Sequence, residues 1–320
     1  MFRSGLPIVA FVILGACTSP PEYELILRNG TIVDGIGGPS YVGDLAINDD
    51  RITAVGDLSD SDGVIEVDVS GLVVAPGFIN MLSWAGEALL EDGRSQGDIR
   101  QGVTLEVFGE GVSGGPLTDQ MKTLEVTSQG DIKFDVEWTT LGEYLEYLVK
   151  KGVSTNVASF VGATTLRIHE VGYDDRPPTD EELDRMRALV RQAMEEGALG
   201  IGSSLIYAPA FYAQTDELIE LSKVAAEYDG MYISHMRSEG NALLESIDEL
   251  LTIAREAGIR SEIYHLKAAG EANWDKLDTA ISKIESARTH GLEITADMYN
   301  YTAGSTGLDA AMPPLSLIHI

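Results

Sequence analysis

Two short β-type runs end in histidine: Gly230-Met-Tyr-Ile-Ser-His235 and Ser261-Glu-Ile-Tyr-His265. The histidines are 30 residues apart, about the length of one strand–helix–strand unit, and residues 239–257 between them have the apolar spacing of a helix. Neighbouring parallel strands of a barrel end at the same rim, so the two imidazoles are expected to point at one spot and form a metal site. Either histidine alone could equally be an ordinary hydrogen-bonded polar group.

Similar apolar runs of strand length recur along the chain, and helix-like segments separate most of them. The runs are 73–79, 103–108, 155–161, 199–206, 230–235, 260–265 and 291–299. The clearest helix opens with a capping box of Thr179 and Glu182 and ends at Gly197. This alternation predicts a parallel α/β fold. Seven runs favour a (β/α)8-type TIM barrel of about seven strands, incomplete by one, over an open sheet.

The part of the chain before the barrel has a different pattern. Residues 24–75 alternate apolar and polar positions, with turn signals such as Asn29-Gly30, and predict a small N-terminal β-sandwich domain. The barrel is assigned to residues 76–314, and 315–320 is a doubtful tail. The chain ends soon after the seventh run, whereas a complete barrel has eight strands, so an incomplete open reading frame is expected. Within the barrel, the polar, glycine-rich stretch 112–135 is expected to be a long loop that either covers the site or is simply solvated.

The first 17 residues have the pattern of a lipoprotein signal peptide. A basic start is followed by an apolar run, Leu6–Ala16, too short to span a membrane, and Leu14-Gly-Ala-Cys17 matches the bacterial lipobox. Residues 18–23 would be a tether. We therefore expect an exported, periplasmic lipoprotein anchored to a membrane through a lipid on Cys17. An ordinary secretory peptide with an incidental cysteine is the alternative.

Charge and cysteine content exclude two classes of protein. The chain has 51 acidic residues against 22 Lys and Arg, for a net charge of −29, which argues against a nucleic-acid partner. Cys17 is the single cysteine, so an internal disulfide framework is excluded.

A carboxylate is available to join the two histidines. The run that begins at Val103 carries Glu106 in its middle and ends at Glu110. Glu106 would be costly to bury unless paired, whereas Glu110 falls at the mouth of the barrel. Glu110, His235 and His265 would form a catalytic zinc set with an open position for water, and one Zn²⁺ ion there would lower the pKa of that water and polarise a carbonyl. Glu110 could also be only a loop carboxylate between flexible glycines.

Further polar residues follow the last strand runs. Lys267 comes two residues after His265 and could meet a substrate carboxylate, or lie on the surface. Tyr299 ends the last run and Ser305 follows it, and their hydroxyls could orient an anionic ligand, although such tyrosines often only pack. Arg237 and Glu239, just after His235, are expected to pair with each other.

Several motifs together resemble one known family. They are Val74-Ala-Pro-Gly-Phe-Ile79, Gly202-Ser-Ser-Leu-Ile-Tyr207, Ser234-His-Met-Arg-Ser-Glu-Gly240, His265-Leu-Lys267 and the segment Asp297–Gly307. Over residues 24–314 the chain resembles the N-acyl-D-amino-acid deacylases (D-aminoacylases) of the amidohydrolase superfamily. The resemblance implies a metal-dependent barrel, with a small β domain built from both chain ends, that hydrolyses the amide of an N-acyl D-amino acid. It places His235 and His265 on metal-ligand positions, and Lys267, Tyr299 and Ser305 on positions that hold the substrate carboxylate.

The sequence departs from the family pattern at three places. Leu82 and Trp84 stand where the family has His-x-His, so a second metal ion is not expected. Glu110 stands in place of the family's bridging cysteine, and a carboxylate still binds zinc. The family's catalytic aspartate is expected beyond residue 320, so no general base is assigned and this chain alone is expected to be inactive.

These observations favour a metal-dependent hydrolase that cleaves N-acyl D-amino acids by attack of metal-bound water. Another amidohydrolase activity, such as that of a dipeptidase or a cyclic-amide hydrolase, is one alternative. A non-catalytic, ligand-binding lipoprotein on the same barrel is the other, and the loss of the His-x-His pair favours it.

Overall fold

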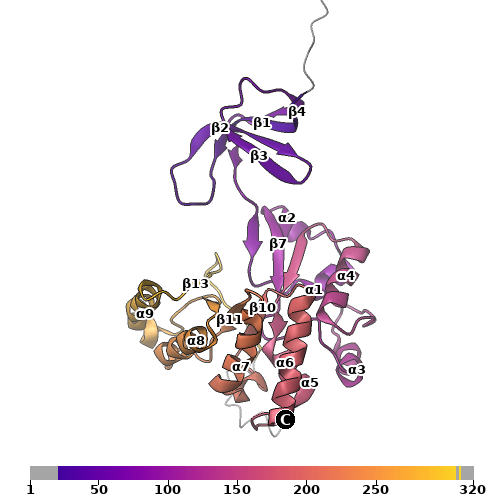
Figure 1. Ribbon diagram of the computed structural model, residues 1–320, viewed down its shortest axis with the longest axis vertical. Coiled ribbons are helices and arrows are strands. Elements are labelled where there is room, and N and C mark those ends of the chain that lie inside the picture. Colours follow the sequence, from indigo (N-terminus) through magenta and orange to yellow (C-terminus); the bar gives the residue numbers. More distant parts are fainter. Residues whose placement is uncertain (1–20, 308–309, 311–320) are drawn as a thin grey trace, which may run out of the picture. The chain divides into compact units, whose positions relative to one another are not determined.

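The computed structural model describes residues 21–307 and residue 310 (Figure 1). Cys17, the remainder of the expected signal peptide and the tail 315–320 lie outside the described residues. The chain divides into two compact units, and the boundary along the chain falls between Pro76 and Gly77. Among the described helices, none has both the length and the apolar character needed to cross a bilayer.

The first unit is built on a single five-stranded sheet in its described residues. Its strands are β1 (Tyr23–Ile32), β2 (Tyr41–Asn48), β3 (Arg51–Gly56), β4 (Gly63–Asp68) and β5 (Val73–Val74). The order is β3-β2-β1-β4, with β5 also beside β1, and only the β1–β2 and β2–β3 pairs are antiparallel. A second sheet, which a sandwich requires, is not among the residues described in this unit. The prediction of a hairpin turn at Asn29-Gly30 is wrong. Strand β1 continues through these residues with a shift in its pairing to β2, and Asn29 takes a φ of 61°.

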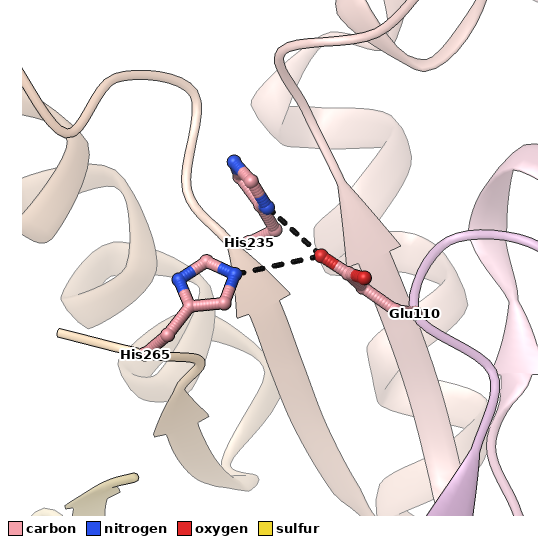
Figure 2. Close-up of side chains that lie close together, drawn as sticks. All are labelled: Glu110, His235 and His265. Carbon is pink, nitrogen blue, oxygen red and sulfur yellow. Dashed lines mark hydrogen bonds and ion pairs between the residues drawn. The ribbon is translucent and has the colours of Figure 1, made fainter. Parts of the chain in front are cut away.

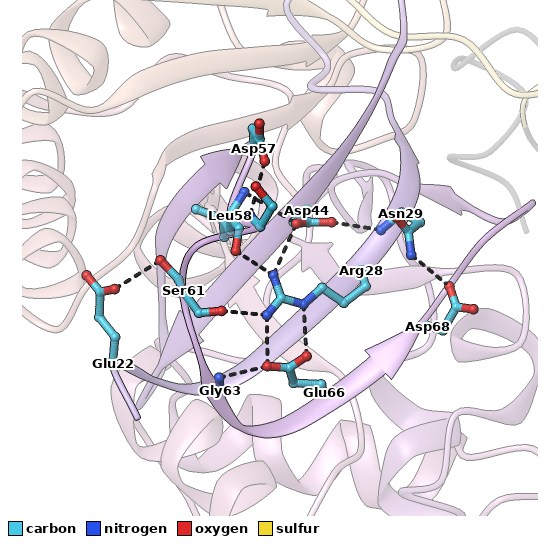
Figure 3. A network of polar contacts seen from close by, with 11 residues as sticks. Glu22, Arg28, Asn29, Asp44, Asp57, Leu58, Ser61, Gly63, Glu66 and Asp68 are labelled. Atoms are coloured by element: carbon cyan, nitrogen blue, oxygen red, sulfur yellow. Dashed lines mark hydrogen bonds and ion pairs between the residues drawn. The ribbon is translucent and has the colours of Figure 1, made fainter. Parts of the chain in front are cut away.

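One arginine ties the loop after β3 to this sheet (Figure 3). Arg28 on β1 pairs with Asp44 at 3.2 Å and with Glu66 at 2.8 Å, and donates to the backbone carbonyls of Leu58 and Ser61 at 2.7 Å each. The hydrogen bond from Arg28 lowers the pKa of Glu66 to about 2, and the backbone N–H of Gly63 contributes further. The guanidinium therefore adds a hydrogen bond to the Leu58 carbonyl, which also accepts from the N–H of Ser61, and satisfies the carbonyl of Ser61.

The second unit contains the parallel strands that the sequence predicts. They are β6 (Phe78–Asn80), β7 (Val103–Phe108), β8 (Asn156–Ser159), β9 (Val161–Gly162), β10 (Gly200–Ser204), β11 (Met231–His235), β12 (Arg260–Ile263) and β13 (Ile294–Ala296). They form two parallel sheets, β6-β7-β8 and β9-β10-β11-β12-β13, and the chain passes from one sheet to the other at Phe160. In the described residues β6 and β13 are not paired, so the barrel is not closed.

The first of the seven expected runs, 73–79, is not one buried strand. Its start is β5 of the first unit, its end is β6 of the second, and Pro76-Gly77 separates them. Proline cannot donate a hydrogen bond to a sheet, which explains the break. Phe78 and Ile79 are 65% and 55% exposed, because β7 is the one described partner of β6.

Helices connect the parallel strands and lie beside them in Figure 1. They are α1 (Gly86–Glu91), α2 (Gln96–Ile99), α3 (Asp119–Ser128), α4 (Leu141–Lys151), α5 (Ala163–Glu170), α6 (Asp180–Glu195), α7 (Thr215–Ala226), α8 (Leu243–Ala257) and α9 (Leu277–Thr289), with short 3-10 turns at Ala210–Tyr212 and Glu271–Lys276. The predicted capping box of Thr179 and Glu182 is confirmed at the start of α6, and Gly197 follows this helix with a φ of 100°. The stretch 112–135 is not simply a loop, because it contains α3, capped by Thr118.

A small apolar cluster fills the inside of the strand wall. It consists of Val107, Phe160, Ile233 and Tyr264, with Leu82 among the side chains packed against it. Side chains alternate along a strand, so on β11 His235 faces the same side as Ile233 and lies two residues nearer the carboxyl end. The apolar cluster thus forms the floor beneath the polar residues at the mouth of the strands.

Candidate metal centre

The two histidines and the carboxylate singled out in the sequence lie together (Figure 2). Nδ1 of His235 is 2.8 Å from Oε1 of Glu110, and Nε2 of His265 is 3.6 Å from the same oxygen. The imidazole centroids are 4.5 Å apart, with the rings nearly perpendicular at 84°. One ligand atom from each residue can be chosen such that all three lie within 4.8 Å of one another. Among the described residues, this is the one group of three acidic, histidine or cysteine side chains close enough to share a metal ion.

Two glycines set the position of Glu110 just after β7. Gly109 and Gly111 have φ values of 101° and 73°, which side chains other than glycine rarely adopt. A Cβ on Gly109 would lie 2.4 Å from the backbone oxygen of Phe160, and a Cβ on Gly111 would lie 2.7 Å from Cβ of Ser204. The turn therefore presses against the neighbouring strands and directs Glu110 toward the histidines. Gly109 and Gly111 are closely packed, so Glu110 does not lie in a flexible loop.

His235 has unused capacity to bind a ligand. It is 7% exposed, and its Nε2 atom is buried with no hydrogen-bond partner among the described residues. Tyr207 packs edge-on against its ring, with centroids 5.6 Å apart. A buried imidazole nitrogen without a partner is costly and marks a place where a ligand or an ion is missing from the network.

His265 sits in a strained backbone conformation that neighbouring acids hold in place. Its φ is 37°, and its N–H donates to Oδ1 of Asp297 at 2.6 Å. Its Nδ1 is 2.7 Å from Oε1 of Glu239, while its Nε2 faces Glu110. A carboxylate on the outer nitrogen of a metal-binding histidine fixes the ring and leaves the other nitrogen for the metal. Such backbone strain is common at functional sites.

The pKa values in the metal-free site reflect these contacts. Burial alone would raise the pKa of Glu110, but its pairing with His235 and His265 outweighs burial and lowers this pKa to about 2. Burial would lower the pKa of His265, but Glu110 and Glu239 outweigh it and raise this pKa to about 9. At neutral pH the imidazole of His265 is therefore positively charged between the carboxylates of Glu110 and Glu239.

The positions where the resembled family has His-x-His hold side chains with other tasks. Leu82 packs against the apolar floor of the barrel. Trp84 is 68% exposed, and its indole N–H donates to Oε2 of Glu110 at 2.9 Å. The hydrogen bond leaves Oε1 of the same carboxylate for the histidines. Trp84 thus orients Glu110, a role that its sequence position alone did not indicate.

The residues expected to hold a substrate carboxylate are only partly assembled. Lys267 lies beside His265, where its Nζ is 2.6 Å from Oε1 of Glu239 and 5.5 Å from the centroid of the Tyr299 ring. The rings of Tyr299 and His265 are 6.3 Å apart. Ser305 is exposed and makes no contact with these groups among the described residues.

From the sequence alone, Glu239 was assigned to the wrong partner and Asp297 was given no role. Arg237 does not pair with Glu239: it binds Glu249 at 2.9 Å, and Glu239 serves His265 and Lys267 instead. Proximity in sequence suggested the wrong partner, because β11 ends at His235 and the chain turns before Glu239. Asp297 was quoted only as part of a motif. Its place just after β13, beside the end of β12, was the available signal.

The donor set suits a borderline metal ion such as zinc. Two imidazoles and one carboxylate are the ligands of many catalytic zinc sites, in which the fourth position stays open. The carboxylate of Glu239 accepts a hydrogen bond from the outer nitrogen of His265, as is common in such sites. The residues present therefore fit one metal ion, with Glu110, His235 and His265 as its protein ligands.

Known proteins resemble the chain over most of its length. D-aminoacylase from Alcaligenes xylosoxydans xylosoxydans is 36% identical over 289 residues, which cover 89% of this chain and 59% of that protein. The chain is a homologue of the D-aminoacylases. It matches no protein-family model. It spans about three fifths of the length of this relative.

Solved structures agree with this relationship. A D-aminoacylase studied for one-metal activation and second-metal attenuation of its binuclear centre superposes with a TM-score of 0.78, at 33% identity, covering 87% of this chain and 59% of that one. The N-acyl-D-glutamate deacylase of Bordetella bronchiseptica, solved with zinc and a phosphonate mimic of the tetrahedral intermediate, gives a TM-score of 0.76 at 31% identity, with 87% and 59% coverage. The resemblance inferred from the sequence is confirmed, as is the TIM-barrel fold class.

Proposed function

We propose that this D-aminoacylase homologue is part of a hydrolase that uses one zinc ion to cleave the amide bond of N-acyl D-amino acids. The observation that carries the proposal is the convergence of Glu110, His235 and His265 at the ends of neighbouring strands. Zinc bound there would lower the pKa of a water molecule and polarise the amide carbonyl. The names of the relatives, D-aminoacylase and N-acyl-D-glutamate deacylase, support the choice of substrate.

The neighbouring residues orient the proposed metal ligands or bind the substrate carboxylate. Trp84 and Glu239 orient Glu110 and His265 through the hydrogen bonds described above. Lys267 is the cation nearest to His265 and is assigned to the substrate carboxylate, with Tyr299 and Ser305. To bind a substrate, Lys267 has to share its ammonium between Glu239 and the incoming carboxylate. The ammonium has three N–H donors and lies 2.6 Å from Oε1 of Glu239, 2.9 Å from Nδ1 of His265 and 3.2 Å from the backbone oxygen of His265. A substrate carboxylate would therefore replace a contact with His265 and leave the contact with Glu239 in place.

One ion rather than two follows from the side chains at 82 and 84. Leu82 has no ligand atom, and the indole nitrogen of Trp84 can only donate a hydrogen bond. Its N–H also engages the Glu110 oxygen that faces away from the histidines. A second ion bridged by Glu110 would need that oxygen.

The proposal is tested on the full-length protein that contains this chain. We expect about one equivalent of zinc by elemental analysis, and hydrolysis of N-acetyl-D-amino acids but not of their L isomers. His235→Ala should lose both zinc and activity. His290→Ala is the matched control, because His290 is exposed at the end of α9 and its Nδ1 lies 2.7 Å from the backbone oxygen of Ser286. Zinc retained at the wild-type level in His235→Ala would refute the assignment.

We also propose that the protein is exported and anchored through Cys17. The support is the lipobox Leu14-Gly-Ala-Cys17 after an apolar run, read from the sequence. Cells that express the full-length protein and are fed labelled palmitate should incorporate the label, and Cys17→Ser should abolish incorporation. Equal labelling of wild type and variant, or none in the wild type, would contradict the anchor.

A further inference from the structure

A cavity of about 270 Å³ opens beside Glu110. Glu110 and Trp84 line it, but His235, His265 and Lys267 do not. Glu110 therefore borders both the cavity and the histidine site, whereas Lys267, Tyr299 and Ser305 do not border the cavity. Its volume is below the usual range for drug-sized ligands and suits a short chain or a small group.

Aromatic rings form one wall of this cavity. Trp138 lies 5.1 Å from Tyr144 and is stacked on Phe134 at 6.1 Å, centroid to centroid. Tyr144 is 6% exposed, and its hydroxyl has no hydrogen-bond partner among the described residues. That hydroxyl lies against Gly86, another lining residue, where a Cβ would be only 2.7 Å from it. The hydroxyl of this buried tyrosine is therefore available to form a hydrogen bond with a ligand in the cavity.

The charges on the cavity wall all have the same sign. Besides Glu110, Glu87 on α1 and Glu125 on α3 line it, and no lysine, arginine or histidine does. Neither Glu87 nor Glu125 has a hydrogen bond or an ion pair through its carboxylate with any residue that the structure describes. Burial raises the pKa of Glu125, and the charge of Glu87 raises it further. A cation in the cavity would relieve this repulsion.

We propose that the cavity receives the acyl part of the substrate and selects an acyl group that ends in an ammonium ion, as aminoacyl groups do. The proposal rests on the proposed function, which puts the substrate carboxylate near Lys267 and the scissile amide near Glu110. The acyl chain of such a substrate extends past Glu110 into the cavity. The carboxylates attract its ammonium, the aromatic faces add cation–π attraction, and the Tyr144 hydroxyl accepts a hydrogen bond.

Binding in the cavity can be measured without catalysis. Trp84 and Trp138 line the cavity, so n-pentylammonium should change the tryptophan fluorescence of the full-length protein, whereas 1-pentanol should bind about tenfold more weakly. Glu125→Gln should remove this preference. Glu256→Gln should not, because Glu256 is an exposed residue of α8 whose carboxylate has no hydrogen bond or ion pair with any residue that the structure describes. The preference should persist in His235→Ala, because His235 does not line the cavity.

Substrate preference tests the acyl assignment directly. N-(5-aminopentanoyl)-D-leucine and N-hexanoyl-D-leucine have acyl chains of equal length, and kcat/KM should favour the first by about tenfold. Glu125→Gln should bring the two values together by lowering only the first. Equal kcat/KM values in the wild type would overturn the inference while hydrolysis of both would leave the proposed function standing. Ammonium binding by a protein that hydrolyses neither compound would refute the proposed function and the acyl assignment, and leave only a cation site.

Discussion

Zinc binding to the metal-free protein should expel about one proton, and the donor of that proton should be His265. Its pKa in the metal-free fold is raised to about 9 by Glu110 and Glu239 despite burial, while the pKa of Glu110 is about 2. At pH 7, Glu110 is therefore already ionised and His265 is protonated. Zinc needs the neutral imidazole, so metal binding competes with this proton.

The size of the effect follows from the pKa. Below about 9, each unit of pH raises the fraction of neutral His265 tenfold, so the apparent zinc affinity should rise about tenfold from pH 7 to pH 8 and level off above pH 9. The stability of the metal-free fold changes with pH in the opposite direction to the zinc affinity. Because the folded pKa exceeds the usual 6.5, the stabilisation from this ion pair is complete below pH 6.5 and is lost as the pH rises through about 9.

Competition with a chelator of known affinity, at a series of pH values, gives the zinc affinity. Calorimetry in two buffers with different ionisation enthalpies gives the number of protons released. Glu239→Gln removes one cause of the raised pKa, so the plateau should begin at lower pH, while the control Glu256→Gln should match the wild type. An affinity that changes less than about twofold between pH 7 and pH 8 would refute the reasoning.

Three further substitutions test single contacts. Trp84→Phe removes the N–H that orients Glu110 and should weaken zinc binding by about threefold to tenfold in the same competition assay. Trp274→Phe is the control, because Trp274 has a similar exposure, and it should leave zinc binding unchanged. Equal effects of the two substitutions would count against the contact between Trp84 and Glu110. Thr179→Ala removes the cap of α6 and should lower the free energy of unfolding by about 1 kcal/mol in urea, with zinc affinity unaffected. Gly111→Ala forces a Cβ into a left-handed turn and against Ser204, so it should cost more than about 1 kcal/mol of stability and also weaken zinc binding; wild-type values for both would show that the turn is not constrained.

The strands and the convergence of His235 and His265 were predictable from the sequence because each depends on local pattern. Parallel strands are buried on both faces and therefore appear as apolar runs, and a polar residue at the end of such a run falls at the mouth of the barrel. His235 and His265 satisfy both conditions. The prediction failed for 73–79, where an apolar run spans the junction of two units and only Pro76 indicates the break.

The supporting residues were harder to predict because their contacts join distant segments. Glu239 meets His265 across the β11–β12 connection, and Asp297 reaches the backbone of His265 from the end of β13. The hydrogen bond from Trp84 to Glu110 depends on the conformations of two turns. Charge and spacing along the chain do not specify such contacts, whereas the fold does.

The glycines on either side of Glu110 have a consequence for how such a centre evolves. Backbone geometry fixes Gly109 and Gly111, yet places no such limit on the chemistry of the side chain between them. A lineage can therefore exchange the ligand carried at this point, and with it the hardness of the donor, by a single codon change without rebuilding the turn. In a saturation library we would expect sharp intolerance at 109 and 111. At position 110 we would expect folding to survive more replacements, and metal binding to survive only with side chains that offer a ligand atom.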